Sequence, residues 1–456
     1  MSYKKFANNN EAAKIIKNND TEYAVIQNPA YIFPEIEISP LAKTIAEPAD
    51  SLVAVVMDMD GTTTTTEEIC IHSLEYMVRR ITNRMDKNTW AGLDHVRDYP
   101  HIIGNSTTKH VEYLINTYKS FIDDKSLRSS FIQAALWTLL IGQDESRKRD
   151  VTENVINLGI GNLLSEKKFL SLASSVPDAK EFEAVVKAYT KKYSGLINTD
   201  SFENIVRAAI DIYYQRYHEI LVEVTKGNAD KLAKELLADK TKHLIEPLPG
   251  VGIFLAMVKG LLGDEIVNIS DLLVKQYHQK NPAATDDFNL KQVSKKLLRL
   301  SRMFEQNPLK VAVVTSSIYY EANIVLSEVF RVLLSEVKSW NISTQRKKKI
   351  IKVFSGYKNV YDGFVTASDS NEIRLKPHRD LYSIALHKLA ISRDDFTRVV
   401  GFEDSESGTI SIRTAGIGRC VAVPFAQTAG HNLHAAAFIS YGGLPEVLLK
   451  HNLFIK

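Results

Sequence analysis

The chain contains 456 residues, of which 45% are apolar and 24% are charged, as is usual for globular proteins. Its formal net charge of +3 is small for this length, so electrostatics give no reason to expect a nucleic acid or an anionic membrane as a partner. No apolar stretch approaches the roughly 18 residues of a membrane-spanning helix. The two cysteines cannot form a disulfide framework and the first residues are polar rather than signal-like, so we expect a soluble, cytoplasmic protein.

Residues 1–49 are expected to form an N-terminal extension that wraps the surface of the core. A short helix is predicted over Asn10–Lys17, and four prolines follow it between Pro29 and Pro48. Prolines at this density oppose a regular helix or a central strand. The extension contains no pattern that indicates chemistry.

The next stretch, Val53–Met57, is apolar and ends in Asp58 and Asp60. Its valines predict a strand buried on both faces, as in the parallel sheets of α/β proteins, whose carboxyl edge binds ligands. Two carboxylates two positions apart on an extended chain can point the same way. They could hold a hard cation such as Mg²⁺, or act as nucleophile and proton carrier. A simple strand-to-turn junction explains the same residues about equally well, because Asp and Gly are ordinary turn residues.

From Glu67 to about Glu246 the sequence shows successive helical patterns and no convincing strand. The clearest pattern covers Asp200–Lys226, where apolar residues recur every three or four positions. We expect Asp200 to cap this helix and Glu203 to be its capping-box partner. Residues 67–246 are therefore predicted to be an all-helical domain inserted after the first strand.

The Pro-rich sequence Pro247–Gly250 marks the return of the chain to the core. The core is thus predicted to consist of residues 50–66 and 247–456. Within it, a further, mostly helical insertion is expected at about residues 263–307.

A second buried strand is predicted over Lys310–Val314, and it ends in Thr315, Ser316 and Ser317. Hydroxyl groups and free backbone N–H groups at a strand end suit an anion such as phosphate. A strand that ends in an ordinary Ser/Thr turn fits these residues as well.

Three more strands are predicted, and because strands alternate with helices we expect a doubly wound parallel sheet. Lys376 precedes a helix, where a cation is poorly placed for the helix dipole, so a functional role would account for it. The basic tract Arg346–Lys349 is interpreted as a solvated helix face. The three strands are Gly363–Ala367, Arg398–Glu403, which runs into Asp404, and Arg419–Pro424.

The ordered set of Asp58 with Asp60, Thr315, Lys376, and Glu403 with Asp404 resembles the motifs of the haloacid dehalogenase-like (HAD) superfamily. These motifs are Asp-x-Asp-Gly-Thr, a Ser or Thr after an apolar strand, a Lys, and an acidic pair. The sequence Glu403–Gly408 is similar to the branch that contains β-phosphoglucomutase and phosphoglycolate phosphatase. The resemblance implies a Rossmann-like core with a helical cap, and the insertion here is much longer than a usual cap.

The resemblance also implies roles for these residues in a Mg²⁺-dependent phosphatase. Asp58 would be the nucleophile that forms an aspartyl-phosphate, and Asp60 the general acid and base. The groups expected to hold the phosphoryl oxygens are Lys376, Thr315, Ser316 and Ser317. The expected Mg²⁺ ligands are Asp58, the backbone carbonyl of Asp60, Asp404 and Glu403.

Asp60 also separates reaction classes within the superfamily. Phosphatases and phosphomutases have an acid two positions after the nucleophile, whereas dehalogenases and phosphonatases lack it. In the mutase pattern an Asp and a His follow at positions that here hold Thr65 and Cys70, with His72 shifted by two. Hydrolysis is therefore favoured, with a phosphomutase as the alternative. A catalytically weak binding or scaffold protein is a third interpretation, suggested by the enlarged insertion.

A cap implies a small phosphorylated metabolite as substrate, with sugar phosphates as the first choice. The segment His101–His110 resembles the specificity loop of such caps, which makes Gly104, Ser106 and Lys109 candidates for substrate binding. A surface loop in which Ser106 or Thr107 caps the next helix is the alternative.

Overall fold

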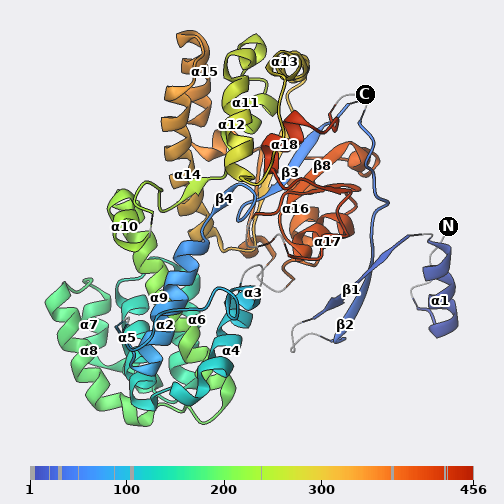
Figure 1. Cartoon of the computed structure of the whole chain (residues 1–456). Coiled ribbons are helices and arrows are strands. Elements are labelled where there is room, and N and C mark those ends of the chain that lie inside the picture. Colours follow the sequence, from blue (N-terminus) through green and yellow to red (C-terminus); the bar gives the residue numbers. More distant parts are fainter. Residues whose placement is uncertain are drawn as a thin grey trace. The chain divides into compact units, whose positions relative to one another are not determined.

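The central sheet of the computed structural model contains β3 and β8, which are labelled in Figure 1. Its six strands follow the order β10-β9-β8-β3-β6-β7. All their pairings are parallel, so the predicted α/β core with a parallel sheet is confirmed. Five strands lie where the sequence predicts them; the sixth, β10, is too short to show any periodicity. The strands are β3 (Ala54–Asp58), β6 (Lys310–Val314), β7 (Gly363–Val365), β8 (Val399–Glu403), β9 (Arg419–Ala422) and β10 (Phe438–Ile439).

The chain divides into two units, each described by itself. The core unit comprises Met1–Thr64, Pro247–Tyr319 and Phe330–Lys456, and the helical unit comprises Thr65–Glu246 and Tyr320–Val329. Where the chain passes between them, strands β4 (Thr64–Thr65) and β5 (Glu246–Pro247) pair with each other. The structure describes residues 6–19, 21–28, 33–49, 51–86, 88–102, 107–237, 239–370, 374–425, 428 and 430–454.

The strand order reverses beside β3. The chain proceeds from β3 outward through β6 and β7, returns to β8 on the other side of β3, and continues outward through β9 and β10. Numbered along the chain, this is the order 3-2-1-4-5-6 of Rossmann folds. In open parallel sheets ligands bind at the carboxyl ends of the strands where the order reverses. Here those strands end in Asp58 and Glu403.

Helices of the core unit cover both faces of this sheet. The helices of the core unit are α11 (Val251–Val258), α12 (Ser270–Lys280), α13 (Leu290–Gln306), α14 (Tyr319–Ser339, whose first half belongs to the helical unit), α15 (Thr344–Phe354), α16 (Asp380–Lys388), α17 (Glu406–Thr414), α18 (Gly443–Leu449) and, in the N-terminal extension, α1 (Asn9–Asn18), which has no buried residue. On one face, Val56 of β3 packs in a buried cluster with Leu381 of α16 and Ile412 of α17. On the other, Phe402 of β8 meets Phe254 of α11 with ring centroids 5.3 Å apart.

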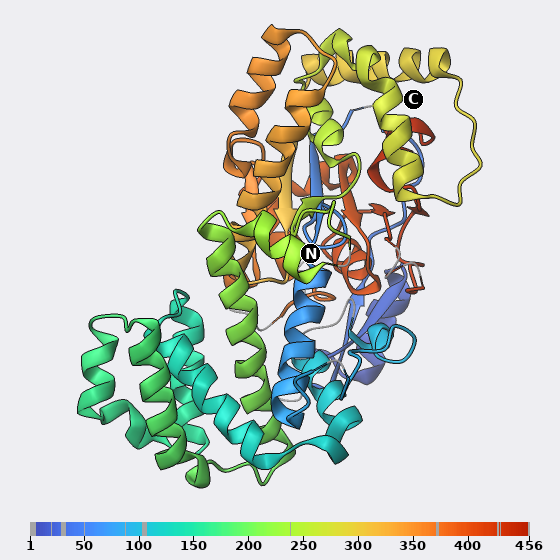
Figure 2. The same ribbon diagram turned by 60° about the vertical axis from the view of Figure 1, so that its left-hand side comes forward.

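The helical unit contains no strand between β4 and β5 in its described residues (Figure 2). Its longest helix, α9, begins one residue later than predicted: Ser201 rather than Asp200 is the N-cap, and its side chain accepts a hydrogen bond from the Asn204 N–H at 3.2 Å. Its helices are α2 (Glu67–Thr82), α3 (Tyr99–Ile102), α4 (Thr107–Tyr118), α5 (Asp124–Leu140), α6 (Glu145–Asn157), α7 (Lys167–Ala173), α8 (Ala179–Tyr193), α9 (Phe202–Thr225) and α10 (Ala229–Leu236).

The N-terminal extension contains the predicted helix, α1, and also a hairpin that the sequence does not predict. Strands β1 (Tyr23–Gln27) and β2 (Ile36–Pro40) pair antiparallel as a separate two-stranded sheet. Pro40 ends β2, a position that proline tolerates in a strand. The chain after the hairpin is bound to the core through backbone hydrogen bonds, from Ala42 N–H to the Arg413 carbonyl and from Ile45 N–H to the Gly418 carbonyl.

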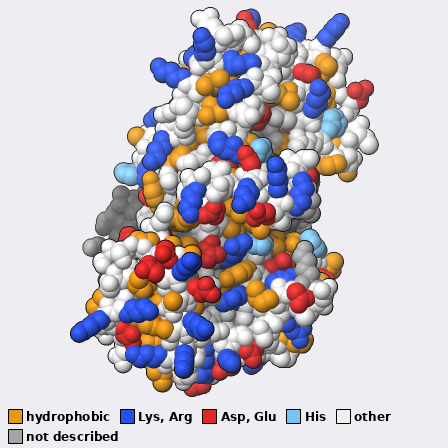
Figure 3. All heavy atoms as spheres, turned by 90° about the vertical axis from the view of Figure 1, so that its left-hand side faces the viewer, with side chains coloured by type: hydrophobic (Ala, Val, Ile, Leu, Met, Phe, Trp, Pro, Cys, Tyr) orange, Lys and Arg blue, Asp and Glu red, His pale blue; other side chains and the backbone are white. Residues whose placement is uncertain are grey.

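Charged side chains of both signs are interspersed on the face shown in Figure 3. The basic tract lies on α15, and the interpretation as a solvated helix face holds for only part of it: Lys348 and Lys349 are exposed, whereas Arg346 is half-buried and forms an ion pair with Glu305 at 2.9 Å.

Among the described residues, no helix combines the length and apolar character needed to cross a membrane.

Arg413 of α17 fastens the extension to the core. Its side chain is 1% exposed and donates to the Ala42 carbonyl at 2.6 Å and the Ala435 carbonyl at 2.7 Å. Its remaining nitrogen forms an ion pair with Glu22 at 3.1 Å. A buried cation without such partners would be strongly unfavourable, so these groups are tightly coupled.

Arg413→Met is expected to lower the free energy of unfolding by about 2–4 kcal/mol, because it leaves two carbonyl groups without their donor. The control, Arg302→Met, removes a 57%-exposed side chain whose ion pair with Asp264 is screened by water, so it should leave the free energy of unfolding nearly unchanged. Urea denaturation of both variants measures the difference. Equal losses would show that Arg413 is not a structural anchor.

Candidate active site

Three carboxylates meet at the point where the strand order reverses. Asp58 ends β3, Glu403 ends β8 and Asp404 follows it, and all three are buried. One oxygen atom of each lies within 4.8 Å of the others. The strand register explains the meeting: Met57 pairs with Phe402, which places the next residues, Asp58 and Glu403, side by side.

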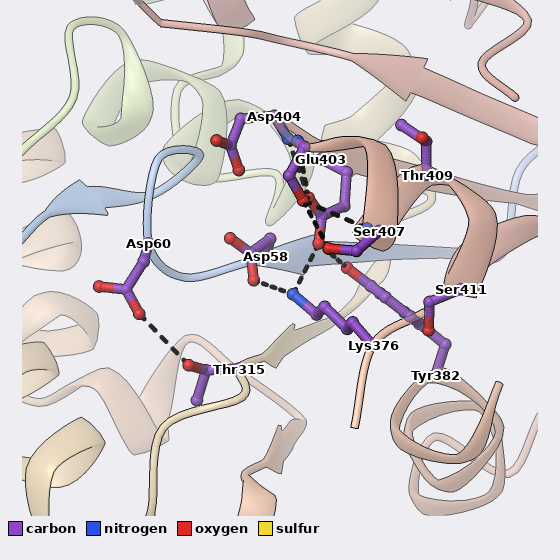
Figure 4. Close-up of polar contacts among 12 residues, drawn as sticks. Asp58, Asp60, Thr315, Lys376, Tyr382, Glu403, Asp404, Ser407, Thr409 and Ser411 are labelled. Atoms are coloured by element: carbon purple, nitrogen blue, oxygen red, sulfur yellow. Dashed lines mark hydrogen bonds and ion pairs between the residues drawn. The ribbon is translucent and has the colours of Figure 1, made fainter. Parts of the chain in front are cut away.

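Lys376 lies between two of these carboxylates (Figure 4). Its ammonium group forms ion pairs with Asp58 and with Glu403 Oε1, the latter at 2.6 Å, and its side chain is 8% exposed. Burial lowers the pKa of Lys376, but the charges of Asp58 and Glu403 outweigh it and raise the pKa above its ordinary value. The lysine therefore stays protonated at neutral pH.

The pKa of Asp58 is raised well above its ordinary value. Burial is the largest cause and the charge of Glu403 the next, while Lys376 acts in the opposite direction. One ammonium group among three carboxylates leaves an excess of negative charge. The site therefore favours an additional cation.

The donor set fits a hard divalent cation such as Mg²⁺, which prefers carboxylate oxygens. The turn after β3 is also shaped to admit Asp404: Gly61 has φ +80°, and a Cβ atom there would lie 2.4 Å from the Asp404 Cγ atom. Only glycine allows this close approach. The backbone carbonyl of Asp60 stays a predicted ligand.

Glu403 is held by several donors besides Lys376. Its Oε2 atom accepts from the Asp404 N–H at 3.0 Å and from the Ser405 N–H and hydroxyl at 3.2 and 3.0 Å, and its Oε1 atom accepts from the Tyr382 hydroxyl at 3.2 Å. A Cβ atom on Gly408 would lie 1.8 Å from Glu403 Cδ. Glu403 thus combines its place in the carboxylate cluster with the anchoring of Lys376.

Asp60 lies in the turn beyond β3, next to the end of β6. Its Oδ2 atom accepts from the Thr315 hydroxyl at 3.3 Å and from the Ser317 hydroxyl at 3.4 Å. Thr315 is buried, and its hydroxyl also accepts from the Ser317 N–H at 3.0 Å. Ser316, the third predicted hydroxyl, is exposed. The first and second motifs are therefore in direct contact.

The substrate-binding residues predicted in the insertion are not part of this cluster of motif residues. Gly104 and Ser106 lie outside the described residues, and Thr107 is the first residue of α4. Lys109 is exposed on α4 of the helical unit. Their role in substrate binding stays a prediction.

The sequence prediction omitted three contributors to the site: Tyr382, Ser405 and Gly408. Ser405 and Gly408 lie within the motif Glu403–Gly408, so the sequence marked their positions but did not indicate what they do. Tyr382 lies six residues after Lys376 and looks like one more apolar position of α16. Only the tertiary contact with Glu403 brings its hydroxyl to the site.

Comparisons with known proteins found no matching family model and no matching curated protein. Similar solved structures include CbbY from Rhodobacter sphaeroides in complex with phosphate, at 12% identity and TM-score 0.37, covering 87% of this chain and 99% of that chain. A HAD family hydrolase from Deinococcus radiodurans R1 with bound phosphate and sodium has 13% identity and TM-score 0.34, covering 88% and 100%. β-Phosphoglucomutase from Clostridium difficile has 14% identity and TM-score 0.29, covering 85% and 90%.

The strand order is that of Rossmann folds, and the four motif segments contact one another at one edge of the sheet. The motifs come from segments far apart in the sequence. Their order alone predicted the resemblance, and the fold brings them together.

Mg²⁺ is expected to raise the midpoint of thermal unfolding of the wild type, since a ligand at 100 times its dissociation constant stabilises the native state by about 2.7 kcal/mol. Asp404→Asn should remove most of this shift, because it deletes one buried anionic ligand without changing side-chain size. Asp394→Asn, at an exposed position, is the control. An unchanged Mg²⁺ shift in Asp404→Asn would exclude Asp404 as a ligand.

Proposed function

We propose that this chain is a Mg²⁺-dependent phosphatase that hydrolyses a small organic phosphate monoester through an aspartyl-phosphate on Asp58. The observation that carries the proposal is the position of Asp58: it ends the central strand where the strand order reverses, in contact with Lys376 and in a cluster with Glu403 and Asp404. Phosphoryl transfer depends on positioning a nucleophile and on compensating negative charge, and this cluster offers both.

Charge compensation comes from Lys376 and from the proposed cation. Asp58 and Asp404, with Glu403 and the backbone carbonyl of Asp60, would hold Mg²⁺, which neutralises charge on the phosphoryl oxygens when bound. Lys376 is the protein's own cation at this point and is proposed to bind a phosphoryl oxygen together with Thr315. Its ion pair with Asp58 also favours the ionised carboxylate that must attack phosphorus.

Asp60 is the proposed general acid and base. Asp58 attacks phosphorus, the bond to the substrate oxygen breaks, and Asp60 donates a proton to the leaving alkoxide. Asp60 then accepts a proton from the water that attacks the aspartyl-phosphate, so that inorganic phosphate leaves and Asp58 is restored. The Ser317 hydroxyl holds the Asp60 side chain for these transfers, and the Thr315 hydroxyl, which donates to Asp60 in the structure, is proposed to turn to the phosphoryl oxygen when the substrate binds.

The proposed substrate is a small phosphorylated metabolite, with sugar phosphates as first choice, and neither a nucleic acid nor a membrane is proposed as a partner. A cytoplasmic location is proposed as well. The substrate class rests on the resemblance of the insertion to a cap, and the candidate contacts in it are Gly104, Ser106 and Lys109.

Asp58→Asn should lower phosphate release from a panel of sugar and other small organic phosphates by about 10³-fold or more, because it removes the nucleophile. Chelation of Mg²⁺ should abolish release by the wild type, and Asp394→Asn should leave release unchanged. Release that persists in Asp58→Asn would overturn the proposed mechanism. If the wild type releases no phosphate, a bisphosphate-primed isomerisation assay would test the phosphomutase alternative.

Asp60→Asn should lower kcat by about 10²–10⁴-fold with an alkyl phosphate, because general acid catalysis contributes that much when the leaving group is a poor one. With p-nitrophenyl phosphate the first step should be much less affected, since p-nitrophenolate leaves without a proton. The burst of nitrophenol followed by slow turnover, measured by stopped flow, reports the two steps separately. An equal loss of the burst rate with both substrates would contradict the role of Asp60 as acid.

A further inference from the structure

The hairpin of the N-terminal extension contacts the loop that contains Lys376. Glu37 of β2 forms an ion pair with Arg374, from Oε2 to Nη2 at 2.8 Å, across 337 positions of sequence. Arg374 lies two residues before Lys376. Both groups belong to the core unit.

The Arg374 guanidinium also reaches the chain beyond Lys376. Its Nη2 atom lies 3.4 Å from Nδ1 of His378, and its Nε atom lies 3.4 Å from Oδ2 of Asp380. Burial, and then the charge of Arg374, lowers the pKa of His378, so the neutral ring can accept at Nδ1. One guanidinium therefore connects both sides of Lys376. Its shortest contact of the three is the ion pair with Glu37 at 2.8 Å.

Glu37 is in turn held in place by the hairpin. Its Oε1 atom accepts from Nδ2 of Asn28 at 3.1 Å, and the same nitrogen donates to the Pro34 carbonyl at 2.7 Å. Asn28 is 6% exposed, and its N–H donates to the Glu35 carbonyl. Glu37 also pairs with Ile26 in the register of the two strands. The Glu37 carboxylate is therefore held by a hydrogen bond from Asn28, and its backbone belongs to a paired strand.

We infer that Glu37 is a positioning residue for Lys376: through Arg374, the N-terminal hairpin orders the loop 374–380 and so places the ammonium group at the phosphoryl site. The inference rests on the proposed function, because it assigns Lys376 a part in the reaction. It gives the extension a role in catalysis that its own sequence does not indicate. Glu37 touches no reacting group itself.

The extension offers a matched control for this contact. Glu22 forms an ion pair with Arg413 at 3.1 Å, and Arg413 lies on α17, outside the Lys376 loop. Glu37→Gln and Glu22→Gln are the same chemical change in the same segment, and each removes one ion pair to the core. Only the first loosens Arg374.

Two measurements on the full chain test the inference. Hydrogen exchange should accelerate in the peptide that covers residues 374–380 in Glu37→Gln and stay at the wild-type rate in Glu22→Gln. With Mg²⁺ and the best substrate of the panel, kcat should fall roughly 10-fold in Glu37→Gln, with KM within about two-fold, because small displacements of a catalytic group affect the transition state most. Glu22→Gln should keep the wild-type kcat.

A double-mutant cycle shows whether the effect passes through Arg374. Arg374→Gln should also lower kcat, and the double variant Glu37→Gln/Arg374→Gln should be no slower than Arg374→Gln alone. Losses that multiply in the double variant would overturn the proposed path. Equal exchange and equal kcat in Glu37→Gln and Glu22→Gln would overturn the inference as a whole.

The two proposals fail in different ways. If the wild type releases no phosphate, the proposed function fails, while the exchange of residues 374–380 still decides whether Glu37 orders the loop. If the wild type is active and exchange does not change, the function stands and the inference fails.

Discussion

The buried ion pairs of Lys376 are the interaction on which the site depends. Three buried carboxylates placed together repel one another, and each would cost free energy without a compensating charge. Lys376 contacts two of them, Asp58 and Glu403, and leaves a net negative charge for a metal ion to offset. With such an ion bound, the remaining negative charge would be offset, which the proposed transfer of a phosphoryl group requires. The charge balance that stabilises the folded cluster is therefore also the charge balance on which the proposed reaction depends.

The backbone makes this cluster possible by coming very close to it. Gly61 and Gly408 lie where any Cβ atom would overlap the carboxylates of Asp404 and Glu403. Parallel pairing of β3 with β8 supplies the other half of the geometry, since it brings two strand ends with acidic residues to one edge. Sheet topology places the acids in one region, and two glycines allow the final approach.

The extension is part of the core rather than an appendage to it. Arg413 binds the extension through the Ala42 carbonyl and Glu22, and Arg374 connects the hairpin to the Lys376 loop through Glu37. Both contacts use an arginine of the core and an acid of the extension. Contacts at two separate positions fix the orientation of the N-terminal extension as well as its position, whereas a single contact would leave it free to rotate.

The sequence determined those parts of the protein that depend on interactions between residues close together in the chain. Apolar runs such as Val53–Met57 predict buried strands, periodic patterns predict the helices, and the order of the motif residues predicts a site at one sheet edge. The hairpin β1–β2, the short strand β10, the cap at Ser201, and the contacts of Tyr382 and Glu37 could not be predicted in this way. Each depends on a partner or a backbone geometry that periodicity does not encode, and for Glu37 the partner is 337 positions away. The sequence thus determined which residues are candidates for the site, and the tertiary structure decided which residues hold them in place, because a hydrogen bond between distant residues exists only once the chain has folded.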